Sequence, residues 1–147
     1  MTNATDRPLE PGFELFEVTA DVGVVARGPT PEAALAEAAR GMYAVMVELD
    51  GVRNRESRVV ELRADDLEHL LERWLLELLF LTESEDMLFS RFEVTLGEAG
   101  ALRATAYGEP IDVERHVLGP EVKAITRHQL GVRPVAGGYE ARVVFDI

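Results

Sequence analysis

Two acidic residues and the end of the chain carry the groups best suited to chemistry. Asp21 interrupts an apolar run in V-T-A-D-V-G, where aspartate suits a strand poorly and the following glycine favours a turn or bulge that aims the carboxylate. The chain ends in V-V-F-D-I, so the side chain of Asp146 lies next to the α-carboxylate of Ile147. Two anions this close are unfavourable unless a cation or a basic side chain joins them.

If the terminal strand runs near Asp21, three carboxylates and neighbouring backbone carbonyls form a site made only of oxygen. Such ligands suit a hard cation such as Ca²⁺ or Mg²⁺. Two alternatives stay open at this point. An arginine or Lys123 could be the counter-ion, or the carboxylates could simply be solvated at a sheet edge.

A second concentration of polar residues lies between Gly108 and His128. It comprises Glu109, Asp112, Glu114, Arg115, His116, Glu121, Lys123, Arg127 and His128. Glu109 and Asp112 flank a Pro-Ile turn and His116 follows, a carboxylate–histidine pairing that could serve acid–base chemistry. No nucleophile accompanies this pairing. We therefore interpret the segment first as a solvated loop, with a binding or catalytic loop as the alternative.

The motifs of common nucleotide-binding and hydrolytic sites are absent from the sequence. It contains no G-x-x-x-x-G-K-[ST], no G-x-G-x-x-G after a strand, no H-E-x-x-H and no G-x-S-x-G. The three histidines, His69, His116 and His128, are too scattered to suggest a zinc site. The lack of cysteine excludes disulfides, thiolate metal sites and a cysteine nucleophile.

Composition predicts one acidic globular domain. The 147 residues are 47% apolar, which is enough for a core. A formal net charge of −12 disfavours nonspecific nucleic-acid binding and favours divalent cations or a basic partner surface. We see no signal peptide, and no uncharged stretch approaches the roughly 20 residues that span a bilayer. We expect a cytoplasmic protein with no membrane partner.

The element that must position these groups is a predicted helix over residues 65–81. Seven leucines and Trp74 recur with a period of 3.6 and form one apolar stripe. Asp65 is the expected N-cap, with Glu68 completing a capping box. Leu76 and Phe80 widen the stripe, which predicts burial on more than one side.

A second helix is predicted from Pro31 to Leu49, because Thr30 can cap it and proline suits the first helical position. Gly108-Glu109-Pro110 is expected to leave the strand ladder, since proline cannot donate there. Alternating apolar and polar residues and β-favouring runs mark eight candidate segments, from which we expect about seven strands: 13–18, 22–27, 55–63, 88–96, 102–107, 122–128, 132–135 and 139–147.

These elements predict an α+β fold, because the strands are mostly hairpin-connected and only two long helices interrupt them. We expect a single two-layer domain over residues 13–147, with both helices packed on one face of a largely antiparallel sheet. Residues 1–12 are expected to form a flexible tail.

Five segments of the chain resemble, in order, blocks of the archease family. They are T-A-D-V-G at 19–23, L-F-S-R-F-E-V at 88–94, G-E-P-I-D at 108–112, E-V-K-A-I-T-R-H at 121–128 and G-G-Y-E-A-R-V-V-F-D-I at 137–147. No single block is decisive, but five in this order are specific. The resemblance runs from about Phe13 to the last residue.

The resemblance implies a non-enzymatic accessory protein. Archeases assist the RtcB-type RNA ligase, which joins RNA ends in tRNA splicing with GTP and manganese, by promoting its guanylylation and repeated turnover. The family also binds a divalent cation. The resemblance therefore implies calcium, with magnesium or manganese as alternatives, held by Asp21, Asp146 and Ile147. Residues that match family blocks and are assigned to a partner-facing surface are Glu109, Asp112, His116, Lys123 and His128.

Two positions depart from the family pattern. Val18 stands where histidine is usual, so a contact of that histidine with metal or partner is in question here. Arg127 replaces a more usual aromatic or aliphatic residue. Two other functions remain as alternatives: a metal-dependent small hydrolase or isomerase that uses Glu109, Asp112 and His116, and a general chaperone-like binding module.

Overall fold

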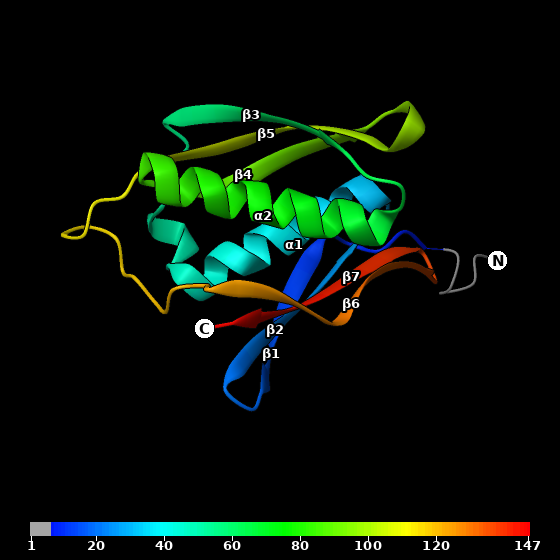
Figure 1. Cartoon of the computed structure of the whole chain (residues 1–147), viewed down its shortest axis with the longest axis horizontal. Helices are drawn as coiled ribbons and strands as arrows, with labels where there is room; N and C mark the ends of the chain where they lie inside the picture. The colour runs from blue at the N-terminus through cyan, green and yellow to red at the C-terminus, as the bar shows by residue number, and fades with distance from the viewer. Residues whose placement is uncertain (1–6) are drawn as a thin grey trace.

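The computed structural model describes residues 7–147, with seven strands and two main helices (Figure 1). Of the predicted 1–12 tail, residues 1–6 lie outside the described residues, and the Leu9 amide donates to the Gly137 carbonyl at 2.9 Å. The elements in chain order are β1 (Gly12–Val18), β2 (Asp21–Gly28), α1 (Pro31–Met46), η2 (Leu49–Gly51), β3 (Glu56–Arg63), α2 (Leu67–Glu85), β4 (Met87–Leu96), η3 (Glu98–Gly100), β5 (Ala101–Pro110), β6 (Ala124–Val135) and β7 (Gly138–Asp146).

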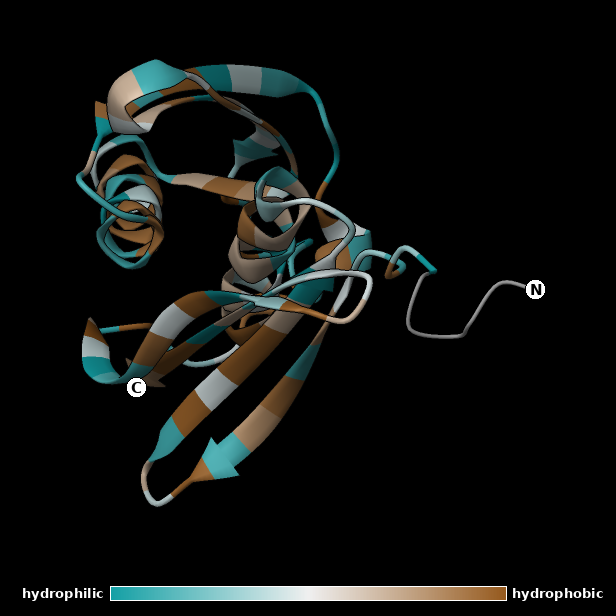
Figure 2. Cartoon of the chain, turned by 90° about the vertical axis from the view of Figure 1, so that its right-hand side faces the viewer, coloured by the Kyte–Doolittle hydropathy of each residue, from teal (hydrophilic) through white to brown (hydrophobic). Residues whose placement is uncertain are grey.

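The strands form two antiparallel sheets. One has four strands in the order β1-β2-β7-β6 and the other has three in the order β3-β5-β4. The helices lie between the two sheets, as the view along them shows (Figure 2). The α+β class, the antiparallel pairing and the two helices are thus confirmed. The layering differs from the expected single sheet with helices on one face.

The small residues of α1 allow this helix to pack against both sheets. Thr30 caps this helix, its hydroxyl accepting from the Ala33 amide at 3.1 Å, and Pro31 opens it as predicted. Because small buried residues line α1, the backbones of neighbouring strands can approach the helix closely on two sides. These residues are Ala34, Ala38, Ala39 and Gly41. α1 therefore contacts β2 and β7 of one sheet and β4 of the other.

The second helix, α2, is held to α1 by hydrogen bonds inside the core. Trp74 Nε1 donates to the Leu35 carbonyl at 3.0 Å, and the Tyr43 hydroxyl bonds to Thr82 at 2.6 Å and the Leu78 carbonyl at 3.1 Å. Burial raises the pKa of the Tyr43 phenol far above its ordinary value, although the Thr82 hydroxyl lowers it in part. The phenol is therefore neutral wherever the protein is folded.

The ends and faces of α2 differ from the sequence prediction. Its N-cap is Asp66, which accepts from the His69 amide at 2.8 Å, rather than Asp65. The helix continues to Glu85 instead of ending at Leu81. Leu76 and Phe80 are 46% and 61% exposed, because only one side of α2 faces the core, so the prediction of burial on further sides was wrong.

Two strand predictions also need correction. β5 continues through Glu109 to Pro110, which pairs with Met87; proline is tolerated because it is the last residue of the ladder. β6 is one strand rather than two segments, and its register breaks between Thr126 and Gly131. Within residues 7–147, no helix has the length and apolar character needed to cross a membrane.

We predict that Thr30→Ala lowers the free energy of unfolding by about 1 kcal/mol, because the Ala33 amide loses its partner at the start of α1. Urea unfolding followed by circular dichroism measures this difference. Thr30→Ser keeps the hydroxyl and should match the parent chain. Equal loss in both variants would show that packing of the threonine methyl, not the cap, supplies the stability.

Candidate functional site

The turn between β1 and β2 places Asp21 at the first position of its strand. Val18 pairs with Asp21 across a two-residue turn, in which Ala20 has a positive φ of 64°. On its other side Asp21 lies opposite Asp146 of β7, which in turn lies opposite Ala124 of β6. One row across the four-stranded sheet thus contains both predicted aspartates, as the sequence analysis expected if the terminal strand ran near Asp21.

Directly opposite residues in antiparallel strands point to the same face, with Cβ atoms about 4.5–5.5 Å apart. Asp21 is half-buried and Asp146 is exposed. Within residues 7–147, neither aspartate nor the terminal carboxylate forms an ion pair. Lys123 contributes its amide, which donates to the Asp146 carbonyl at 2.8 Å. Two like charges opposite each other, with no basic side chain between them, destabilise the sheet.

The neighbouring row on the same face is largely apolar. It contains Phe16, Gly23, Val144 and Thr126 in order across the strands. The ring of Phe16 lies over Gly23, where a Cβ would be 2.0 Å from the ring carbon Cζ. Thr126 Oγ1 is buried and has no hydrogen-bond partner within the described residues. The aspartate pair therefore borders a largely apolar row on its own face of the sheet.

The donor types in the aspartate row are those that a hard divalent cation prefers. The row provides the carboxylates of Asp21 and Asp146 and no nitrogen or sulfur donor, and Ile147, the third residue of the predicted ligand set, follows Asp146 directly in the sequence. Oxygen-only donor sets favour Ca²⁺, Mg²⁺ or Mn²⁺ over zinc or copper. The unpaired charges and the unpartnered Thr126 hydroxyl are consistent with this assignment.

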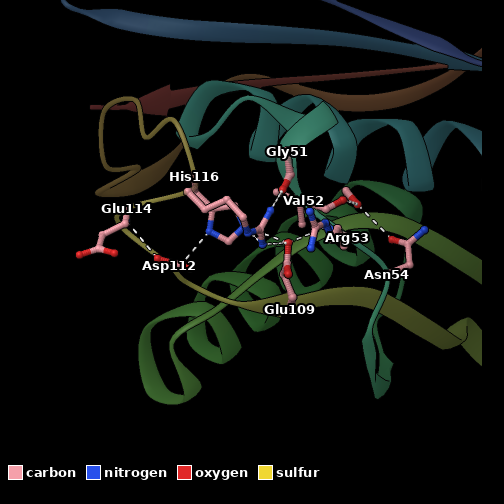
Figure 3. A network of polar contacts seen from close by, with 10 residues as sticks. Gly51, Val52, Arg53, Asn54, Glu109, Asp112, Glu114 and His116 are labelled. Atoms are coloured by element: carbon pink, nitrogen blue, oxygen red, sulfur yellow. Dashed lines mark hydrogen bonds and ion pairs between the residues drawn. The ribbon is translucent and has the colours of Figure 1, made fainter.

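A separate polar network is buried beneath the loop that follows β5 (Figure 3). Glu109 is 1% exposed and His116 is 5% exposed. The Glu109 carboxylate accepts from the Arg53 amide at 2.7 Å and from His116 Nε2 at 2.9 Å, and it forms an ion pair with Arg115. Arg115 also donates to the Gly51 carbonyl at 2.7 Å. The network therefore ties the loop to η2 and the segment after it.

Hydrogen bonds fix the position of the His116 ring proton and keep the Glu109 carboxylate ionised. The Asp112 amide donates to His116 Nδ1 at 2.9 Å, so the ring proton is on Nε2 and points to Glu109. Burial alone would raise the pKa of Glu109. The bonds from Arg115, the Arg53 amide and His116 outweigh burial and lower that pKa to about 2. Glu109 is thus a fully ionised anchor at neutral pH, and both ring nitrogens of His116 are occupied.

Comparison with known proteins assigns the chain to a family. A model of the Archease protein family (MTH1598/TM1083) matches residues 13–147. The chain belongs to the archease family. Protein archease of Methanothermobacter thermautotrophicus is 41% identical over 92% of this chain and 99% of its own length, and protein archease of Methanosarcina mazei is 39% identical over 92% and 95%.

An experimental structure from this family has the same fold. The solution structure of Methanobacterium thermoautotrophicum protein 1598 superposes with a TM-score of 0.81 at 40% sequence identity. The match covers 92% of this chain and 99% of that protein. The fold described here, with helices between two antiparallel sheets, is therefore an archease fold.

One of the two departures from the archease pattern, Val18, lies in the aspartate row. Val18 lies beside Asp21, because the two residues are opposite each other in the β1–β2 register. This chain places an aliphatic side chain there and keeps only oxygen donors in the row. Sequence reasoning missed Phe16 and Thr126, since their closeness to the aspartates follows from strand register and not from any motif.

The residues assigned to a partner-facing surface do not form one surface. Asp112, Lys123 and His128 are exposed. Glu109 and His116 are buried and bonded to each other, so the structure places them beneath the surface, whereas the other three residues are exposed. Polar residues such as these are usually exposed. Here Arg115 and the Arg53 amide satisfy Glu109, and the Asp112 amide satisfies His116 Nδ1, which allows both residues to be buried.

A third polar group, at the start of α2, is explained by helix capping. Asp66, Glu68 and His69 bring three potential ligand atoms within 4.8 Å of one another, and all three residues are exposed. The His69 amide and ring lower the pKa of the Asp66 carboxyl, and Asp66 raises the pKa of His69. This cluster serves the helix N-terminus.

Proposed function

We propose that this archease is a non-enzymatic activator of an RtcB-type RNA ligase in tRNA splicing and RNA repair. It would promote guanylylation of the ligase and so allow repeated turnover. The observation that supports this proposal is the pairing of Asp21 with Asp146 beside the chain terminus, on an outer sheet face, in a member of this family. The net charge of −12 would speed association with a ligase whose nucleotide- and RNA-binding cleft is basic.

The proposal includes a divalent cation, preferably Ca²⁺ with Mg²⁺ or Mn²⁺ as alternatives, held by Asp21, Asp146 and the carboxylate of Ile147. A bound cation would supply a Lewis acid and neutralise the three carboxylates. The chain's own residues orient the ligands: the β1–β2 turn fixes Asp21, and the Lys123 amide fixes the backbone of Asp146. Phe16 lies over Gly23, in the neighbouring row on the same face.

Direct stimulation of the ligase tests the function. The cognate RtcB-type ligase joins a 3′-phosphate RNA in the presence of this protein at a substoichiometric amount. We expect product to exceed one equivalent per ligase and the guanylylated ligase to accumulate. The proposal would be contradicted if this protein does not increase product formation by the ligase while a second archease does so in the same assay.

Thermal unfolding tests the cation without any ligase. At a free Ca²⁺ concentration of about 100 times its dissociation constant, binding to the folded state adds about 2.7 kcal/mol. For a chain of this length, we expect the melting temperature to rise by roughly 5–10 °C. Chelation with EDTA should reverse the rise, and titration with Mg²⁺ and Mn²⁺ ranks the metals.

Asp21→Asn provides the matched control for this thermal shift. It should lose the response to Ca²⁺ while it gains slightly in stability without metal, since one of two opposed charges is gone. A similar response in Asp21→Asn and the parent chain would show that calcium binds elsewhere on the acidic surface. A parent chain that does not respond to any of the three metals would remove the cation from the proposal.

The network around Glu109 does not support the hydrolase alternative. An acid–base pair needs a group that can exchange a proton with a substrate. His116 uses both ring nitrogens within the protein, and Glu109 is buried against Arg115. We therefore propose no catalytic role for Glu109, Asp112 or His116.

A further inference from the structure

A groove runs beneath the loop that connects β5 to β6. The loop crosses the C-terminal ends of α1 and α2 and encloses a space of about 310 Å³. The floor of this space is apolar and comes from both helices, β4 and the loop itself: Met46, Leu79, Leu88, Ile111 and Val122. We call it the loop groove. An apolar hollow of this kind is suited to one large side chain of another molecule.

Backbone contacts fix the wall of the loop groove. The Gly119 amide donates to the Met46 carbonyl at 2.8 Å, and the Glu48 amide donates to the Val117 carbonyl at 2.9 Å. Leu118 forms a β-bridge with Val47. At Gly119 a Cβ would lie 2.5 Å from the Val45 carbonyl oxygen, so only glycine permits this approach. The loop groove is therefore preformed, which limits the entropy cost of filling it.

The loop presents apolar side chains to solvent beside the loop groove. Leu118, which lines the loop groove, is 47% exposed, and Val117, which lines a neighbouring hollow, is 58% exposed. Val113 is 75% exposed and lies elsewhere on the loop, outside both hollows. Leu118 lines both the loop groove and a second hollow of about 690 Å³ on the η2 side. Exposed aliphatic residues gathered at a hollow mark an interaction surface more than scattered ones do.

The borders of both hollows are acidic. Glu83, Asp86 and Glu121 line the loop groove, and Glu48 and Asp50 line the second hollow. All five are exposed, and no lysine, arginine or histidine is among the lining residues. This rim repels phosphate groups and attracts cationic side chains, so its complement is a basic protein segment rather than a nucleotide or RNA.

We propose that the loop groove docks an exposed segment of the partner ligase that carries a large apolar side chain flanked by lysine or arginine. This inference rests on the proposed function. The apolar side chain fills the groove, and the flanking cations meet Glu83 and Glu121. The loop ends at Lys123, whose amide bonds to the Asp146 carbonyl, so a ligase held at the groove also has the Asp21–Asp146 pair beside it.

The test measures binding of the full chain to the intact cognate ligase by titration calorimetry. Leu118→Ala removes the exposed anchor contact, and Glu83→Lys with Glu121→Lys reverses the rim. We expect the dissociation constant to rise at least roughly tenfold in each variant, and the salt dependence of binding to fall in the charge variant. Stimulation at saturating concentrations should be retained, because the aspartate pair is unchanged.

Two control variants test whether the loss of binding is specific to the groove. Leu15 is 45% exposed, lines neither hollow and lies on β1, at the opposite edge of the four-stranded sheet from β6, so Leu15→Ala should bind like the parent. Glu98→Lys makes half of that charge change at η3, outside both hollows. Thermal unfolding verifies that every variant is folded.

The outcomes separate this inference from the proposed function. If folded Leu118→Ala and the charge variant bind as tightly as the parent while the parent stimulates the ligase, the groove proposal is wrong and the function stands. If the parent neither binds nor stimulates the ligase, both proposals are overturned. If Glu98→Lys costs half or more of the binding free energy that the rim variant costs, the effect is one of overall charge and the groove proposal is also wrong.

Discussion

Asp146→Asn is expected to end repeated turnover of the ligase while it leaves the archease folded. Asparagine keeps the size of the side chain but removes one of the charges opposite Asp21. Loss of an outer-shell partner of a metal costs about 10–100-fold in affinity, so loss of a direct ligand should cost at least about 100-fold. In the joining assay, product should stop at one equivalent per ligase even with excess variant.

The control for this variant is an exposed acid away from the row. Glu98→Gln removes the same amount of charge at η3 and should stimulate the ligase like the parent chain. Urea unfolding should give Asp146→Asn a stability equal to or slightly above that of the parent without metal. Repeated turnover at the parental rate with Asp146→Asn would show that the aspartate pair has no part in activation.

Glu109→Ala is expected to lower the free energy of unfolding by about 3–5 kcal/mol. The substitution leaves the Arg115 guanidinium, the His116 Nε2–H and the Arg53 amide without their shared acceptor in a buried site. Removing one member of a buried ion pair has this large cost because the remaining charge is uncompensated. Urea unfolding, with the slope of the transition checked for two-state behaviour, measures the loss.

Glu114→Ala is the comparison for Glu109→Ala. Glu114 is exposed on the same loop and its side chain forms no ion pair within residues 7–147, so the loss should stay below about 0.5 kcal/mol. A loss below about 1 kcal/mol in Glu109→Ala would mean that water replaces the carboxylate and that the network does not hold the loop.

Acid should weaken the same network in a defined range of pH. The pKa of Glu109 is lowered in the folded protein from its ordinary value of 4.5 to about 2. A lowered pKa stabilises the folded state fully above the unfolded pKa, and this contribution is lost as the pH falls from about 4.5 towards 2. The difference in unfolding free energy between the parent chain and Glu109→Gln should therefore shrink over that range.

The sequence alone determines the local elements of this protein. The Thr30-Pro31 start of α1, the 3.6-residue stripe of α2 and the alternation of β4 and β7 depend on neighbouring residues, so they can be identified without the fold. The archease family and the candidate residues Asp21 and Asp146 are likewise available from ordered segments of sequence. The oxygen-only site depended on the condition that the terminal strand runs near Asp21, and the strand register meets this condition.

Only the tertiary structure decides which strands pair with each other and which residues are buried. Strand pairing joins residues more than a hundred positions apart, so local pattern specifies neither the Val18–Asp21–Asp146–Ala124 row nor the division into two sheets. Burial of polar groups is equally non-local: Glu109 is buried because Arg115 and the Arg53 amide satisfy it. The reverse holds for Phe80, an apolar residue that stays exposed because no layer covers the outer side of α2.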